Sequence, residues 1–139
     1  HGDLIKPSYG YRIDYGTRSV LISGDTKFDE SIIEEGRGVD VLIHEVAAAR
    51  DELFVKYPAR INIFNHHTTP EQAAMIFNAV QPKLAVYSHF VMMGSPDIPV
   101  IDLEQVVEQT RVTYDGPLVI GYDLLSIEIG DSVSLYSNH

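Results

Sequence analysis

The sequence predicts an α/β fold in which a mixed β-sheet carries helices packed on one of its faces. Apolar runs suited to buried strands occur at 19–22, 39–43 and 83–88. Segments with apolar residues at helical spacing separate them, the clearest after Thr69. Strands and helices in alternation are typical of a layered α/β architecture rather than of a helical bundle.

The expected elements follow one another closely along the chain. The expected strands are 9–15, 19–22, 39–43, 83–88, 118–122, 124–129 and 132–136, of which the first two form a hairpin through Gly16 and Thr17. The expected helices are 29–35, 47–55, one that begins after Thr69 and one that Asp102 opens. Residues 57–64 form an irregular connection.

The helix after Thr69 has the strongest local signal. Thr69 suits the N-cap, Pro70 the first helical position and Gln72 the third, which together make a capping box. Apolar residues then recur on one face, at Ala73, Ile76, Phe77 and Val80. We therefore expect this helix to pack one face on the sheet.

Composition narrows the class of protein. A length of 139 residues with 45% hydrophobic content predicts one domain over 1–139. The formal net charge of −10, without a clustered basic run, argues against a nucleic-acid partner. No apolar run approaches the roughly 20 residues that cross a bilayer, so no membrane partner is expected. Since the sequence has no cysteine, a disulfide and a thiolate zinc site are excluded. The compartment stays open, with the cytoplasm favoured over secretion.

Polar side chains follow three of the apolar runs. Asp25 comes after 19–22 and Gly24, His44 and Glu45 follow 39–43, and His89 follows 83–88. Alone, Asp25 is typical of a turn or an N-cap, His44 and Glu45 of a solvated strand end, and His89 of a core or edge histidine. Three strands that end in such groups instead predict convergence at one edge of a sheet, where open α/β folds place their chemistry.

These residue types suit metal-assisted hydrolysis. Asp and His donors without Cys favour zinc, manganese or iron. A carboxylate such as Asp25 can bridge two ions about 3.5–4 Å apart, and such a pair activates a water molecule. His67 lies just before a helix amino end, which disfavours imidazolium and leaves a neutral ring suited to ligation or proton transfer.

Five motifs, in order, resemble the second half of the metallo-β-lactamase-fold hydrolases, most closely the ribonuclease Z and arylsulfatase-like branch. They are Tyr9–Ile13, Ser23–Thr26, Leu42–Glu45, His67–Thr69 with Gln72–Ala74, and Tyr87–Phe90. The resemblance implies the carboxy-terminal half of an αββα sandwich. It further implies that Asp25 is the bridging metal ligand, that His89 and His1 each ligate one ion, that His67 assists the leaving group and that Glu45 orients His67.

Two departures from the family pattern limit these roles. The main metal-binding motif of the family, His-x-His-x-Asp-His, belongs to the first half of the fold and is absent from this sequence. Each ion then keeps only Asp25 and one histidine, so this chain alone should bind the pair weakly or not at all and be inactive. After His89, Val91–Ser95 replaces the Ser and the Arg-Tyr pair with which ribonuclease Z-like members hold phosphate.

Two functions are therefore expected as alternatives. The first is hydrolysis of a small ester, phosphodiester or sulfate ester at a two-zinc site, with manganese or iron as the other metals, completed by an N-terminal half. The second is a catalytically inactive half-domain that forms a homodimer or binds a partner. Its interface would be an uncovered sheet face, formed by Val20, Ile22, Val41 and Ile43.

Overall fold

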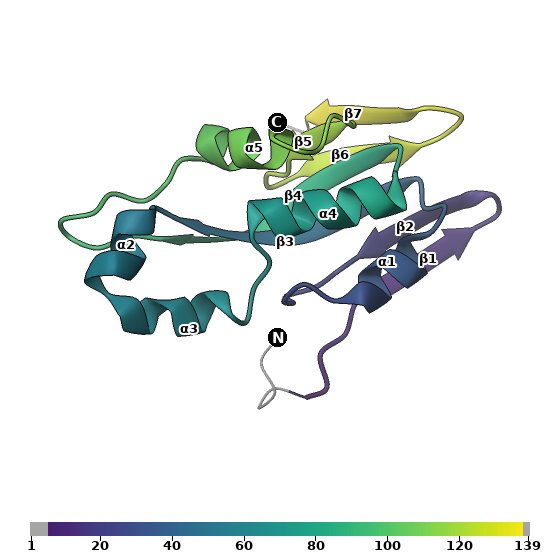
Figure 1. Ribbon diagram of the computed structural model, residues 1–139. Coiled ribbons are helices and arrows are strands. Elements are labelled where there is room, and N and C mark those ends of the chain that lie inside the picture. Colours follow the sequence, from purple (N-terminus) through teal and green to yellow (C-terminus); the bar gives the residue numbers. More distant parts are fainter. Residues whose placement is uncertain (1–5, 138–139) are drawn as a thin grey trace.

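Five strands form one mixed sheet in the computed structural model, which describes residues 6–137 (Figure 1). In spatial order they are β1 (Tyr11–Tyr15), β2 (Arg18–Ile22), β3 (Val41–Ala49), β4 (Leu84–Met93) and β5 (Leu118–Ile120). β1 and β2 pair antiparallel through a tight turn, and β2 to β5 run parallel. The α/β prediction with a mixed sheet is confirmed.

Three helices cover one face of this sheet: α1 (Glu30–Gly36), α4 (Pro70–Val80) and α5 (Leu103–Arg111) (Figure 1). The predicted capping box at Thr69 is present, and Asp102 forms a second one with Gln105. Phe77 of α4 packs at the centre of the core against Tyr87 of β4 and Tyr114. Within the described part of the chain, no helix is long and apolar enough to span a bilayer.

The other face of the sheet is partly covered by a hairpin of β6 (Leu125–Ile129) and β7 (Val133–Ser137). Its side chains Ile127, Ile129 and Val133 pack against a cluster of Val41, Leu84 and Val86, in which Val41 is fully buried. The prediction that Val41 lies on an uncovered face is therefore wrong, because the chain supplies a cover of its own at that position. Val20, Ile22 and Ile43 of the same face stay half-buried.

Two central strands are longer than predicted. β3 continues through His44 to Ala49, and β4 continues through His89 to Met93, since residues 46–49 pair with residues 90–93. The predicted helix over 47–55 is therefore reduced to α2 (Asp51–Lys56). The predicted irregular connection contains a 3-10 turn, η1 (Pro58–Arg60), and a short helix, α3 (Ile61–Phe64).

Candidate metal centre

Asp25 is placed by a backbone contact that only glycine permits. Gly24 has a φ of +67°, and a Cβ at this position would lie 2.6 Å from the carbonyl oxygen of Tyr9. A side chain would therefore be both strained and in collision with the backbone. The segment before β1 thus approaches Gly24 closely, and this contact fixes where the chain leaves β2.

His89 is turned toward Asp25 by an irregularity in β4. The pairing of β3 with β4 skips one residue, because Glu45 pairs with Ser88 while Val46 pairs with Phe90. His89 is the extra residue, and its φ is +46°, a left-handed value that non-glycine residues rarely adopt. Such bulges redirect a side chain near functional sites, and here the redirected group is an imidazole.

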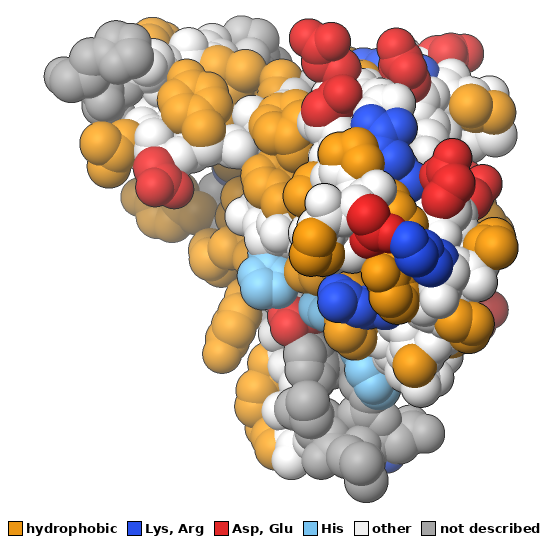
Figure 2. Space-filling view, turned by 90° about the vertical axis from the view of Figure 1, so that its left-hand side faces the viewer, with side chains coloured by type: hydrophobic (Ala, Val, Ile, Leu, Met, Phe, Trp, Pro, Cys, Tyr) orange, Lys and Arg blue, Asp and Glu red, His pale blue; other side chains and the backbone are white. Residues whose placement is uncertain are grey.

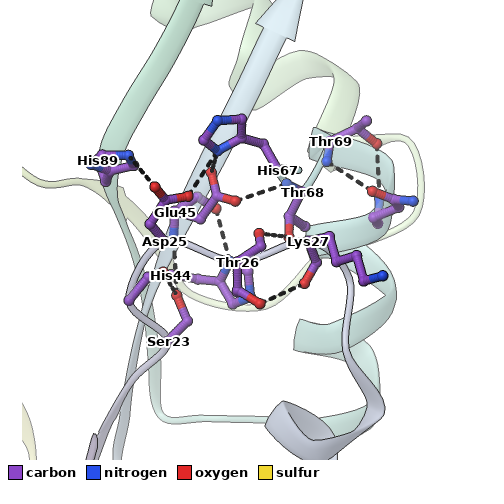
Figure 3. A network of polar contacts seen from close by, with 12 residues as sticks. Ser23, Asp25, Thr26, Lys27, His44, Glu45, His67, Thr68, Thr69 and His89 are labelled. Carbon is purple, nitrogen blue, oxygen red and sulfur yellow. Dashed lines mark hydrogen bonds and ion pairs between the residues drawn. The ribbon is translucent and has the colours of Figure 1, made fainter. Parts of the chain in front are cut away.

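Asp25 lies between two histidines (Figure 3). Its Oδ1 is 3.0 Å from Nδ1 of His67, and its Oδ2 is 3.6 Å from Nε2 of His89. One ligand atom from each of the three residues lies within 4.8 Å of the others. Each carboxylate oxygen therefore faces a different imidazole, and the three groups form a candidate metal cluster.

The donor set of this cluster fits a zinc-like ion. One carboxylate and two imidazoles, with no thiolate, are ligands that zinc, manganese and iron accept. Three protein ligands are the usual number at a catalytic zinc site, whose remaining position holds water or substrate. The cluster therefore has donors enough for one ion and too few for two.

Glu45 lies behind His67 in the interior. Its Oε1 accepts a 2.9 Å hydrogen bond from the backbone N–H of Thr68, and its Oε2 is 3.4 Å from Nδ1 of His67. Burial, with a smaller contribution from the charge of Asp25, raises the pKa of Glu45 to about 8. Burial lowers the pKa of His67, although the Asp25 carboxylate opposes this shift. Glu45 therefore lies beside the His67 ring, and its orienting role stays a prediction.

Sequence reasoning missed the residues that hold Glu45 in place. Thr68 is fully buried, and its hydroxyl donates a 2.9 Å hydrogen bond to the carbonyl oxygen of Thr26. The Ser23 hydroxyl accepts a 3.2 Å hydrogen bond from the backbone N–H of Glu45. These bonds join the segment after β2 to the segment before α4 and to β3. These residues belong to the motifs Ser23–Thr26 and His67–Thr69, but the sequence predicted no role for them.

The remaining predicted site residues are placed as follows. His44, adjacent to Glu45, points into the helical side of the core, where its ring meets the edge of Phe77 at 6.1 Å between centroids. It is a buried core residue and not a solvated strand end. The prediction for His1 lies outside the described residues. The structure thus brings together Asp25, Glu45, His67 and His89.

The mixed sheet and the Asp–His cluster at its edge define an α/β domain with a candidate metal centre. Comparison with known proteins adds the family: the beta-lactamase superfamily domain matches residues 1–90 of the 139. The chain therefore belongs to the metallo-β-lactamase superfamily, and the resemblance seen in the sequence motifs is confirmed.

Individual relatives are distant and longer than this chain. It is 27% identical to ribonuclease Z of Mycobacterium tuberculosis strain H37Rv over 127 residues, which are 90% of this chain and 44% of that protein. It is 33% identical to ribonuclease Z of Bacillus subtilis strain 168 over 112 residues, 81% of this chain and 33% of that protein. The chain spans less than half the length of these relatives.

A solved structure shares the fold. The metallo-beta-lactamase fold protein YhfI from Bacillus subtilis matches with a TM-score of 0.62 at 19% sequence identity. The match covers 84% of this chain and 43% of that chain. The chain therefore has part of a metallo-β-lactamase fold, in agreement with the prediction of a half sandwich.

Proposed function

We propose that this chain is the carboxy-terminal half of a metal-dependent hydrolase that cleaves an ester, phosphodiester or sulfate ester of a small molecule. The observation that carries the proposal is the position of Asp25, with one carboxylate oxygen toward His67 and the other toward His89. An N-terminal half with the His-x-His-x-Asp-His motif would supply the remaining ligands. Two zinc ions are the proposed cofactor, with manganese or iron as alternatives.

Each residue of the cluster has a proposed role. Asp25 and His89, with His1 from the segment before β1, would hold the metal ions, which when bound supply a water activated for attack at neutral pH. His67 would protonate the leaving group. Its Nδ1 faces the carboxylates of Asp25 and Glu45, so the ring would first take up a proton at Nε2 and donate it from there. Glu45 would keep the ring in this orientation.

RNA is the competing substrate, because the curated relatives are named ribonuclease Z. Binding to RNA depends on cationic side chains that neutralise phosphates. This chain has 20 acidic against 10 basic residues. After the candidate ligand His89, Val91–Ser95 also lacks the Arg-Tyr pair of the family pattern. The charge therefore supports a small substrate rather than tRNA.

Zinc titration of the metal-free chain, followed by calorimetry, tests the proposal. We expect weak binding that Asp25→Asn abolishes. Asp115→Asn, at an exposed carboxylate remote from the cluster in sequence, is the matched control and should bind like the unmodified chain. Equal binding by both variants would contradict the proposed site. Turnover of 4-nitrophenyl acetate, bis(4-nitrophenyl) phosphate and 4-nitrophenyl sulfate, with the N-terminal half present, then shows which of the three bonds is cleaved.

The role of His67 needs a separate test, because its Nδ1 lies as close to Asp25 as a ligand atom would. His67→Ala distinguishes the two roles. A proton donor can be removed with little change in zinc affinity but with loss of turnover, most of all for esters with poor leaving groups. If His67 is instead a metal ligand, its removal should lower zinc affinity together with turnover.

A second candidate function, self-association, is supported by one observation. Tyr11, Ile13 and Tyr15 of β1 are 62, 53 and 86% exposed. Their cross-strand partners include Val20 and Ile22, so these side chains share one face of the sheet. Figure 2 shows hydrophobic side chains gathered along the left-hand side of that view. Apolar patches of this kind typically mark interfaces.

Sedimentation of the purified chain tests the second function. A concentration-dependent dimer that Ile13→Lys dissociates would favour self-association through this face. Lys27→Ala, at an exposed residue outside β1 and β2, serves as the control. A monomer over the whole concentration range would contradict homodimerisation and leave the N-terminal half as the proposed cover.

A further inference from the structure

A cavity of about 510 Å³ that is open to solvent lies beside His67, and the proposed metal chemistry does not use it. β2 pairs with β3 only as far as Ile43, so the later part of β3 borders the segment before α4 instead, through the hydrogen bond from Ala47 N–H to the Thr68 carbonyl oxygen. Ala47, Ala48 and Ala49 lie there, and α2 and α3 stand across from them. Side chains of one carbon leave the space between these elements open.

The lining of the cavity is mixed, and one part of it is apolar and aromatic. Phe28, Phe54 and Phe64 line it together with the three alanines. Phe54 and Phe64 meet edge to face, with 4.9 Å between ring centroids. A volume of this size and an aromatic lining are typical of sites for small organic molecules. An aromatic guest would find the same edge and face contacts that the two rings make with each other.

The wall formed by α2 is fastened to the loop after β4. The Tyr57 hydroxyl donates a 3.1 Å hydrogen bond to Asp97, and the Ser95 hydroxyl donates one of 2.7 Å to the same oxygen. Lys56 forms an ion pair with the other carboxylate oxygen of Asp97. These contacts hold the carboxyl end of α2 against the loop after β4. The cavity is therefore formed before a ligand arrives.

The polar rim of the cavity does not suit an anion. The amino end of α4 is already capped, since Thr69 and Gln72 satisfy each other's backbone N–H groups. The Thr69 hydroxyl also donates a 2.8 Å hydrogen bond to the carboxylate of Glu71. Glu71 and Asp51 at the rim oppose the single cation Lys27 among the lining residues. An uncharged guest is therefore favoured over a phosphate or a carboxylate.

We infer that this cavity is the leaving-group subsite of the proposed hydrolase and that it takes an uncharged aryl or branched alkyl group. The inference rests on the proposed function, because His67 lines the cavity and would protonate the leaving oxygen. In the reaction, the bond between the leaving oxygen and the carbonyl carbon, phosphorus or sulfur of the ester breaks. The hydroxyl group of a water molecule becomes bonded to that atom instead. The other proton of that water balances the one that His67 gives, so ester and water yield an acid and a phenol or alcohol.

Phenol binding to the metal-free chain, followed by amide chemical shifts, tests the subsite without any need for turnover. We expect saturable shifts at Asn65 and Gln72, which line the cavity. Ala49→Leu adds three carbons at a half-buried wall position and should weaken phenol binding about ten-fold. Ala59→Leu, at an exposed position of η1 outside the cavity, should leave it unchanged. Benzoate, which has the same ring and a negative charge, should bind less tightly than phenol.

Three results would overturn the inference: shifts elsewhere than the cavity, equal phenol binding by Ala49→Leu and Ala59→Leu, or benzoate binding as tight as that of phenol. Thermal unfolding checks that Ala49→Leu is folded. If it is not, Phe54→Leu trims the opposite wall at another half-buried position and should weaken phenol binding too. Because zinc is absent from this experiment, its outcome is independent of the zinc titration that tests the proposed function.

Discussion

Protonation of His44 should destabilise this protein in mild acid. Its side chain is fully buried, and burial lowers the pKa of His44 from 6.5 to about 4. Nδ1 lies 2.8 Å from the carbonyl oxygen of Glu45, which can only accept, so Nδ1 carries the hydrogen and Nε2 does not. Among the described residues, Nε2 has no hydrogen-bond partner. A second proton there would place a charge in the core.

The sign and size of the effect follow from linkage. The unfolded chain takes up a proton on His44 as the pH falls through 6.5, and the folded chain does so only near 4. The free energy of unfolding therefore falls as the pH decreases over this interval, by about 3 kcal/mol in all. Between pH 7 and pH 5 the loss should be about 2 kcal/mol.

Urea unfolding of the native chain and of His44→Gln at pH 7 and pH 5 measures this loss. Glu45 responds in the opposite sense, because its raised pKa stabilises the fold as the pH falls from about 8 to 4.5. Both proteins contain Glu45, so the difference between their pH responses isolates His44. The native chain should lose about 2 kcal/mol more than His44→Gln. Equal losses would refute the buried neutral imidazole.

Three further predictions follow from the structure. Gly24→Ala should destabilise the fold by about 1–3 kcal/mol, since it combines positive φ with a clash on Tyr9, and should weaken zinc binding in calorimetry. His89→Gly should abolish zinc binding without loss of stability in urea, because it relieves left-handed strain of about 1–2 kcal/mol. Phe77→Ala, fully buried, should cost about 3–5 kcal/mol in the same assay, and a smaller loss would mean that the core refills the space.

Local signals in the sequence predicted much of the fold. Thr69 and Gln72 form their capping box within four residues, and Gly16 turns the hairpin, so neither feature depends on distant parts of the chain. The approach of Asp25 to His89 also followed, because the carboxyl ends of neighbouring parallel strands meet at one edge of a sheet.

What the sequence could not predict depends on pairing between distant segments. Ala47–Ala49 favour helix by intrinsic propensity, yet they form strand because β4 pairs with them along residues 91–93. The same long pairing encloses His44, so a residue expected at a solvated end became part of the core. The cavity beside His67 is lined by this unpredicted part of β3, so the cavity could not be predicted from the sequence either.

The bulge at His89 connects the fold to the site. In a regular β4, successive side chains would continue to alternate between the two faces of the sheet through His89. The left-handed φ of His89 has an energetic cost, and no described core contact depends on it. What the bulge achieves is the approach of Nε2 to Asp25, at the oxygen that His67 does not face. Strain persists where a candidate metal ligand is oriented, and a buried carboxylate, Glu45, lies behind the cluster. Together these two features support a chemical role for this edge of the sheet over a purely structural one.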